Sequence, residues 1–74
     1  MPHITFSRTG EDEARIYEDG RIVGELFRDE DYNRPGGILY TIHLAEDGRG
    51  PVRVRERSSI RKTVIHLLDT LPYR

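Results

Sequence analysis

The 74-residue sequence contains no cysteine and no tryptophan. Without cysteine the chain can form no disulfide and can offer no thiolate ligand to a zinc ion. No stretch approaches the roughly 18 consecutive apolar residues that a membrane-spanning helix needs, and the first residues lack the apolar core of a signal peptide. We therefore expect one small domain, residues 1–74, that is cytoplasmic and has no contact with a membrane.

An excess of charge of one sign is also missing, because the formal net charge is −1 although 34% of the residues are charged. The two signs are nevertheless separated along the chain. Residues 11–31 hold nine acidic residues and three arginines, a formal charge of −6, and residues 49–62 hold six basic residues and one glutamate, a charge of +5. Charge separated in this way can draw one copy of the chain to a second copy.

Alternating apolar and polar residues predict four or five short strands. They lie near residues 3–7, 14–18, 21–28, 38–44 and 52–56. Turn-forming glycine, proline, asparagine and aspartate residues separate these segments. Short connections between successive strands favour an antiparallel meander.

The clearest hairpin signal is Asp19-Gly20, which lies between two alternating segments. A two-residue loop would pair Glu18 with Arg21, whereas a three-residue loop would pair Tyr17 with Arg21. We favour the three-residue loop because it gives one face a cleaner apolar character. That face would hold Ala14, Ile16, Ile22 and Leu26.

A helix is predicted near residues 59–71, with Ser58 or Ser59 as its N-cap and Pro72 at its end. The apolar residues of this segment form one helical stripe: Ile60, Val64, Leu67, Leu68 and Leu71. The predicted fold class is therefore α+β, an antiparallel β-meander with one C-terminal amphipathic helix packed on one face. We expect the helix to cover the inner face of the sheet and to leave the outer face open.

No group of residues matches a catalytic, metal or cofactor signature. His66 and Asp69 share a helix face, but this pair is common on solvated surfaces. Gly36-Gly37 is not followed by the Lys-Ser or Lys-Thr pair of a phosphate-binding loop. The acidic residues 29–31 lack the spacing of a calcium loop and are interpreted as a solvated loop. We expect no enzyme, no cofactor and no small-molecule substrate.

The open outer face is the candidate interaction surface. Strand alternation places on it Arg15, Tyr17, Val23, Phe27, Leu39, His43, Arg53, Arg55 and Arg57. Exposed apolar patches usually mark interaction sites, although Phe27 and Leu39 could simply shield each other under arginine stems. We expect a small non-enzymatic module, of bacterial or phage-like type, that binds a protein partner or a second copy of itself.

Nucleic-acid binding is the alternative function. Arg53, Arg55 and Arg57 alternate along the last predicted strand, so they would share one side and could contact phosphates. Tyr17 or Phe27 could stack on bases. In architecture the segment from about residue 15 to 71 resembles the AP2-type domains and the arm-binding domains of phage integrases, and this resemblance implies that the sheet contacts DNA. The acidic segment departs from such domains, because its carboxylates would repel phosphate.

Overall fold

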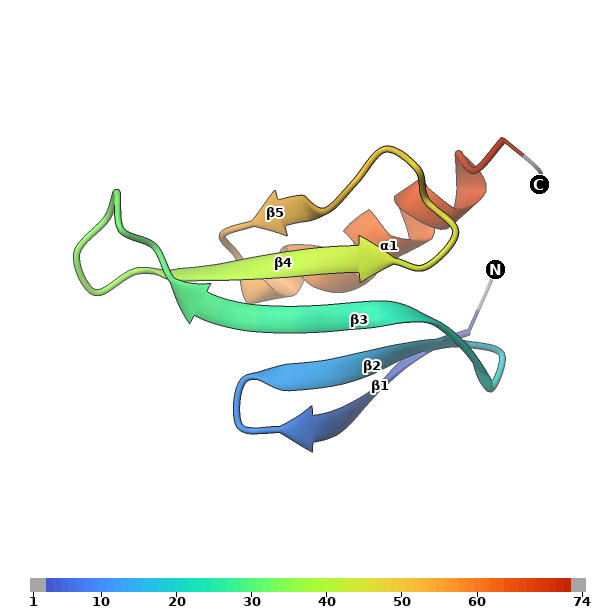
Figure 1. The fold of residues 1–74 in the computed structure, drawn as a ribbon, viewed down its shortest axis with the longest axis horizontal. Helices are drawn as coiled ribbons and strands as arrows, with labels where there is room; N and C mark the ends of the chain where they lie inside the picture. The colour runs from blue at the N-terminus through green and yellow to red at the C-terminus, as the bar shows by residue number, and fades with distance from the viewer. Residues whose placement is uncertain (1–2, 73–74) are drawn as a thin grey trace.

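The computed structural model describes residues 3–72, which form a five-stranded antiparallel sheet and one α-helix (Figure 1). The strands are β1 (Ile4–Gly10), β2 (Glu13–Glu18), β3 (Arg21–Glu30), β4 (Ile38–Leu44) and β5 (Val52–Val54). Their order in the sheet is their order in the sequence. A 3₁₀ turn (Arg57–Ser59) leads into α1 (Ile60–Asp69). The predicted α+β meander with one C-terminal helix is confirmed.

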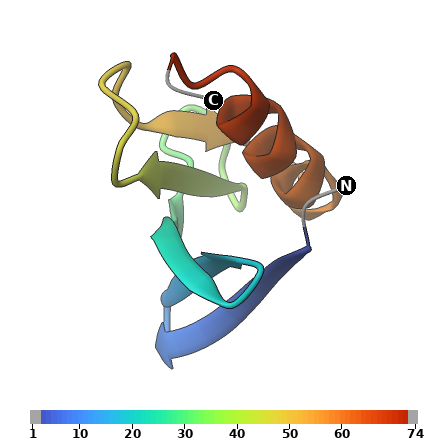
Figure 2. The same ribbon diagram turned by 90° about the vertical axis from the view of Figure 1, so that its right-hand side faces the viewer.

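The core lies between α1 and the inner face of the sheet, which curves around the helix (Figure 2). On the helix side the buried residues are Ile60, Val64, Leu67 and Leu68, with Leu71 just beyond the last turn. On the sheet side they are Ile4, Ile16, Ile42 and Leu44. The predicted apolar stripe is therefore the buried stripe. Each such side chain contributes about 1.5–3 kcal/mol when it is removed from water.

The loop between β2 and β3 has two residues, Asp19 and Gly20, with φ angles of 50° and 83°. Glu18 pairs with Arg21 across this loop, so the three-residue loop that would pair Tyr17 with Arg21 is wrong. Two successive residues with positive φ suit a tight hairpin turn whose twist matches that of the strands. An Asp-Gly sequence adopts this conformation at little cost, because glycine has no Cβ to clash.

A β-bulge follows the loop, and it restores the apolar face that the tight turn alone would have lost. The register shifts so that Ile16 pairs with Gly24, and Val23 is the extra residue. Val23 turns inward and packs against the core, whereas Ile22 is 58% exposed. The sequence analysis placed Ile22 on the inner face and Val23 on the outer face, because strict alternation does not allow for an inserted residue.

The first and the last turn of α1 are stabilised by different hydrogen bonds. Ser59 is the N-cap residue, as predicted, but its side chain makes no capping hydrogen bond. Its backbone N–H instead donates to the carbonyl oxygen of Glu56 within the 3₁₀ turn. The end is held by Arg49, which donates to the Leu67 carbonyl oxygen at 3.0 Å and to Thr70 Oγ1 at 2.8 Å.

Arg49 also holds the loop between β4 and β5 in place. Its Nε and terminal nitrogens donate to Asp47 Oδ1 at 2.7 Å and Asp47 Oδ2 at 3.0 Å. The hydrogen bonds from Arg49 lower the pKa of Asp47, and the same pairing raises the pKa of Arg49. One arginine therefore ties a loop to the last turn of the helix, where carbonyl groups otherwise lack partners.

Candidate interaction surfaces

Tyr17 and Phe27 lie on the outer face of the sheet but not next to each other. Tyr17 pairs with Ile22 near the β2–β3 loop. Phe27 pairs with Thr41 and is the diagonal neighbour of Leu39 further along the sheet. A polar row crosses the sheet between the two pairs and consists of Ser7, Arg15, Glu25 and His43. The outer face therefore has two small apolar clusters and not one continuous patch.

The larger cluster is half-buried. Phe27, Leu39 and Thr41 are each partly covered by their neighbours, which agrees in part with mutual shielding. Arg53 pairs with Thr41 at the margin of this cluster, and Arg55 follows it just beyond the strand. We call the group of Phe27, Leu39, Thr41 and Arg53 the outer-face site.

The three alternating arginines do not share one side, which is a correction to the sequence interpretation. β5 ends at Val54, so of the three only Arg53 lies in a strand. Arg55 Nε lies 3.2 Å from Asp31 Oδ2. Arg57 begins the 3₁₀ turn and lines the inner side of the sheet. Period-two alternation fails here because the chain leaves the sheet two residues earlier than predicted.

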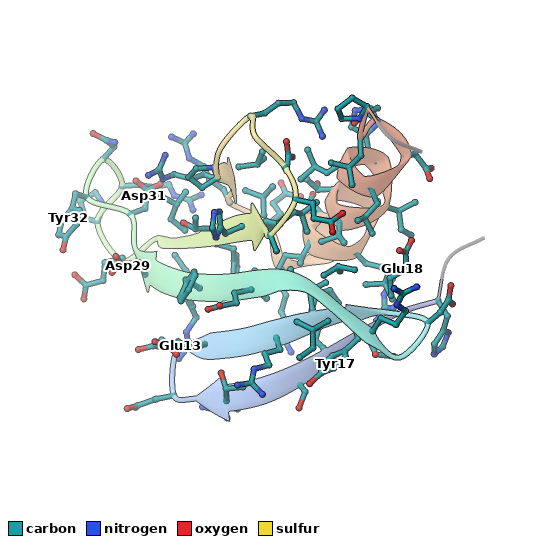
Figure 3. The ribbon with its side chains drawn as sticks, turned by 45° about the vertical axis from the view of Figure 1, so that its right-hand side comes forward. Glu13, Tyr17, Glu18, Asp29, Asp31 and Tyr32 are labelled. Carbon is teal, nitrogen blue, oxygen red and sulfur yellow. The ribbon has the colours of Figure 1, made fainter. Side chains whose placement is uncertain are left out.

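Of the acidic residues expected in a solvated loop, Asp29 and Glu30 are exposed at the end of β3, whereas Asp31 is only 5% exposed. Its Oδ1 accepts the backbone N–H of Asn33 at 3.1 Å, and its Oδ2 faces Arg55 and also Arg34, whose Nε lies 3.6 Å away. A Cβ on Gly37 would lie 2.6 Å from Arg34 Nε, so glycine makes room for this guanidinium. Figure 3 shows Asp31 within the loop and Tyr32 beside it, which is 86% exposed.

The inner face is only partly covered, contrary to the expectation that α1 would cover it. A helix of 10 residues is about 15 Å long, whereas the 10 residues of β3 extend for about 33 Å. Beyond the start of α1 the sheet forms a groove with a volume of about 360 Å³. Its apolar lining consists of Phe6, Ala14, Leu26, Tyr40 and Ile60. We call this feature the inner groove.

Charged side chains surround the inner groove. Arg28 donates to Asp12 Oδ1 at 2.8 Å, and Arg8 donates to the carbonyl oxygens of Gly10 and Glu11 at 3.0 Å. Within residues 3–72, the side chains of Glu11 and Arg57, which also line the groove, have no ion pair or hydrogen bond. Glu13 borders the groove too, but it pairs directly with Phe27, so its side chain lies on the outer face. The sequence interpretation missed the groove, although the short helix and the long third strand were visible signs of it.

Other kinds of site are not found in the described part of the chain. Within residues 3–72, no three His, Asp or Glu side chains are grouped so that they could hold a metal ion. In the same residues no helix is both long and apolar enough to cross a membrane. No protein-family model, curated protein or solved structure matches this chain. Function is therefore inferred from the chain's own surfaces.

Proposed function

We propose that this chain is a non-enzymatic interaction module that binds a protein partner through the outer-face site. The observation that carries the proposal is the placement of Phe27 and Leu39 near Arg53 on one face of the sheet. Figure 1 shows that α1 lies on the other face. Within residues 3–72 no other element covers the face that holds Phe27 and Leu39. Aromatic and arginine side chains at a partly desolvated site are typical anchors of protein interfaces.

The charges around the outer-face site favour protein over nucleic acid. Arg15 and Arg53 are balanced on this face by Glu25, which pairs with Arg15, and by Asp29, which pairs with Leu39. Arg55 faces the carboxylate of Asp31. A nearly neutral face attracts phosphate weakly, because affinity for nucleic acid depends on several uncompensated cations. A protein surface of mixed charge suits such a face better.

The test compares the variant Leu39→Asp with the matched control Ile22→Asp. Both substitutions introduce one carboxylate on the outer face, but Ile22 lies with Tyr17 outside the outer-face site. Nuclease-treated extract of the source cells is passed over each immobilised protein, and retained proteins are then purified and titrated. We expect at least one protein whose affinity falls about tenfold or more with Leu39→Asp, a loss of about 1.4 kcal/mol, and stays unchanged with Ile22→Asp.

Two results would contradict the proposal. If every retained protein binds both folded variants as tightly as the wild type, the outer-face site is not the binding surface. Oligonucleotides, single- and double-stranded, are titrated in parallel at about 50 mM salt. Retention that weakens steeply with added salt and is abolished by Arg53→Glu would replace the protein-binding proposal by nucleic-acid binding.

A further inference from the structure

The inner groove crosses the sheet from the turn between β1 and β2 to Arg57, which lies just beyond β5. The turn between β1 and β2 lies at one end, where the backbone N–H of Arg28 donates to the Asp12 carbonyl oxygen at 2.9 Å. From Arg28 the strand register leads through Tyr40 to Val54, and Arg57 follows just beyond. The β1–β2 turn and Arg57 therefore lie at opposite ends of the apolar lining of the groove.

The basic end of the groove opens into a second feature of the surface. This second feature is a shallow, open depression with a volume of about 460 Å³, and it shares Tyr40 and Arg57 with the inner groove. It is also lined by Arg34 and Arg55, whose guanidinium groups both face the single carboxylate of Asp31. Three cations and one buried carboxylate leave this end positive. We call this depression the arginine hollow.

The other end of the groove combines acidic residues with two arginines, Arg8 and Arg28. Glu11, Asp12 and Glu13 lie in or next to the tight turn that joins β1 to β2. Of these, only Asp12 has an ion pair, with Arg28. Within residues 3–72 the carboxylates of Glu11 and Glu13 have none. We call residues 11–13 the acidic turn.

We propose that a second copy of this chain docks on the inner groove, so that the acidic turn of each copy enters the arginine hollow of the other. A two-fold axis reverses the direction of the groove, so it brings Glu11 of one copy to Arg57 of its partner, and does so twice. Interfaces with two-fold symmetry need such self-complementary surfaces. The contact would also cover Phe6, Leu26 and Tyr40, which are partly exposed in one chain.

A second copy explains the groove better than an acidic peptide. An acidic peptide would match Arg57 and its neighbours, but it would meet repulsion from the carboxylate of Glu11 at the other end. The chain itself carries both charges in separate segments, −6 in residues 11–31 and +5 in residues 49–62. The fold thus sets groups from the two segments at the two ends of one groove, where a two-fold contact can use both.

The experiment measures self-association by sedimentation over a range of concentrations at about 50 mM salt. We expect a concentration-dependent dimer for the wild type. Arg57→Glu and Glu11→Arg should each raise the dimer dissociation constant by about tenfold or more, because each creates two like-charge contacts. An equal mixture of the two variants should regain the wild-type dimer, since opposite charges then face each other at both contacts.

Two controls distinguish the groove from other causes. Lys62→Glu changes the net charge as Arg57→Glu does, but at an exposed position of α1 outside the groove, and it should leave the dimer unchanged. Leu39→Asp, on the outer face, should also leave it unchanged. The proposal is overturned if the wild type stays monomeric up to about 1 mM. It is equally overturned if the mixed variants fail to associate, or if either control weakens the dimer as much as Arg57→Glu.

Discussion

Replacing Gly24 by alanine should destabilise the domain more than its small change in volume suggests. Gly24 lies in the central strand and pairs with Ile16 on one side and Leu44 on the other. A Cβ at this position would lie 2.4 Å from the carbonyl oxygen of His43 and 3.0 Å from Leu44 Cα. Both atoms belong to the backbone of β4, so the clash can be relieved only by moving one strand against its neighbour.

Overpacking a well-filled core costs about 1–3 kcal/mol. Because backbone has to move, we expect Gly24→Ala to cost about 2–3 kcal/mol. A domain of this size has roughly 3–5 kcal/mol of stability in total, so the Tm should fall by roughly 10–20 °C. Thermal and urea unfolding followed by circular dichroism measure both quantities.

Gly48→Ala is the matched control, because a Cβ at Gly48 would meet no atom within 4 Å. It should change the free energy of unfolding by no more than about 0.5 kcal/mol. If Gly24→Ala also stays within about 0.5 kcal/mol of the wild type, the close approach of β3 and β4 at this point is refuted. The register that places Val23 in the core would then need revision as well.

Three further predictions concern the core and the Arg49 contacts. Leu68→Ala, at a position 1% exposed, should cost about 2–5 kcal/mol in urea unfolding, while Ile22→Ala on the outer face should cost about 0.5 kcal/mol or less. The pKa of Asp47 is lowered in the folded state by hydrogen bonds from Arg49, so the ionised carboxylate stabilises the fold above its unfolded pKa of about 3.9. This contribution is lost as the pH falls through the lowered pKa. Below about pH 4 the urea midpoint of the wild type should therefore fall more steeply than that of Asp47→Asn, and parallel curves would contradict this. Arg49→Lys cannot form the same four side-chain hydrogen bonds and should speed amide exchange in the last turn of α1, whereas unchanged exchange would contradict this.

The elements of the fold could be predicted from the sequence because burial imposes a regular period on each of them. The stripe from Ile60 to Leu68 is apolar at helical spacing, and these positions are the buried ones. The segment 38–44 is rich in β-branched and aromatic residues and forms β4 with the predicted bounds. Where one face of an element is buried along its whole length, residue pattern and structure agree.

The β2–β3 hairpin shows where such patterns reach their limit. Asp19-Gly20 favours a tight turn, whereas the apolar face that contains Ile16 favours a register displaced by one residue. Each preference was recognised, but the sequence interpretation treated them as alternatives. The chain satisfies both by inserting a bulge at Val23, and nothing in local propensity indicates which residue becomes the extra one.

Most of the outer-face residues were predictable, but Val23 and Arg57 were not, and neither was the arrangement. Alternation assigns Tyr17 and Phe27 to one face, and that assignment is independent of which strand residues lie opposite each other. Their separation by a polar row depends on the register between strands. The position of Arg57 depends on where β5 ends, and the 3₁₀ turn that follows has no distinctive sequence pattern.

The inner groove exists because α1 is shorter than β3, and no pattern of residue types indicates it. A ten-residue helix spans about half the distance covered by β3, so one helix of this length cannot cover the whole inner face. The partly buried residues Phe6, Leu26 and Tyr40 have the same residue character as the core and were counted with it. Only the fold shows that they lie beyond the start of α1, with the acidic turn at one end and Arg57 at the other. Groups from the two charged segments of the sequence therefore lie at opposite ends of one groove. A two-fold contact between copies requires such an arrangement, because it sets each end of the groove against the opposite end in the partner.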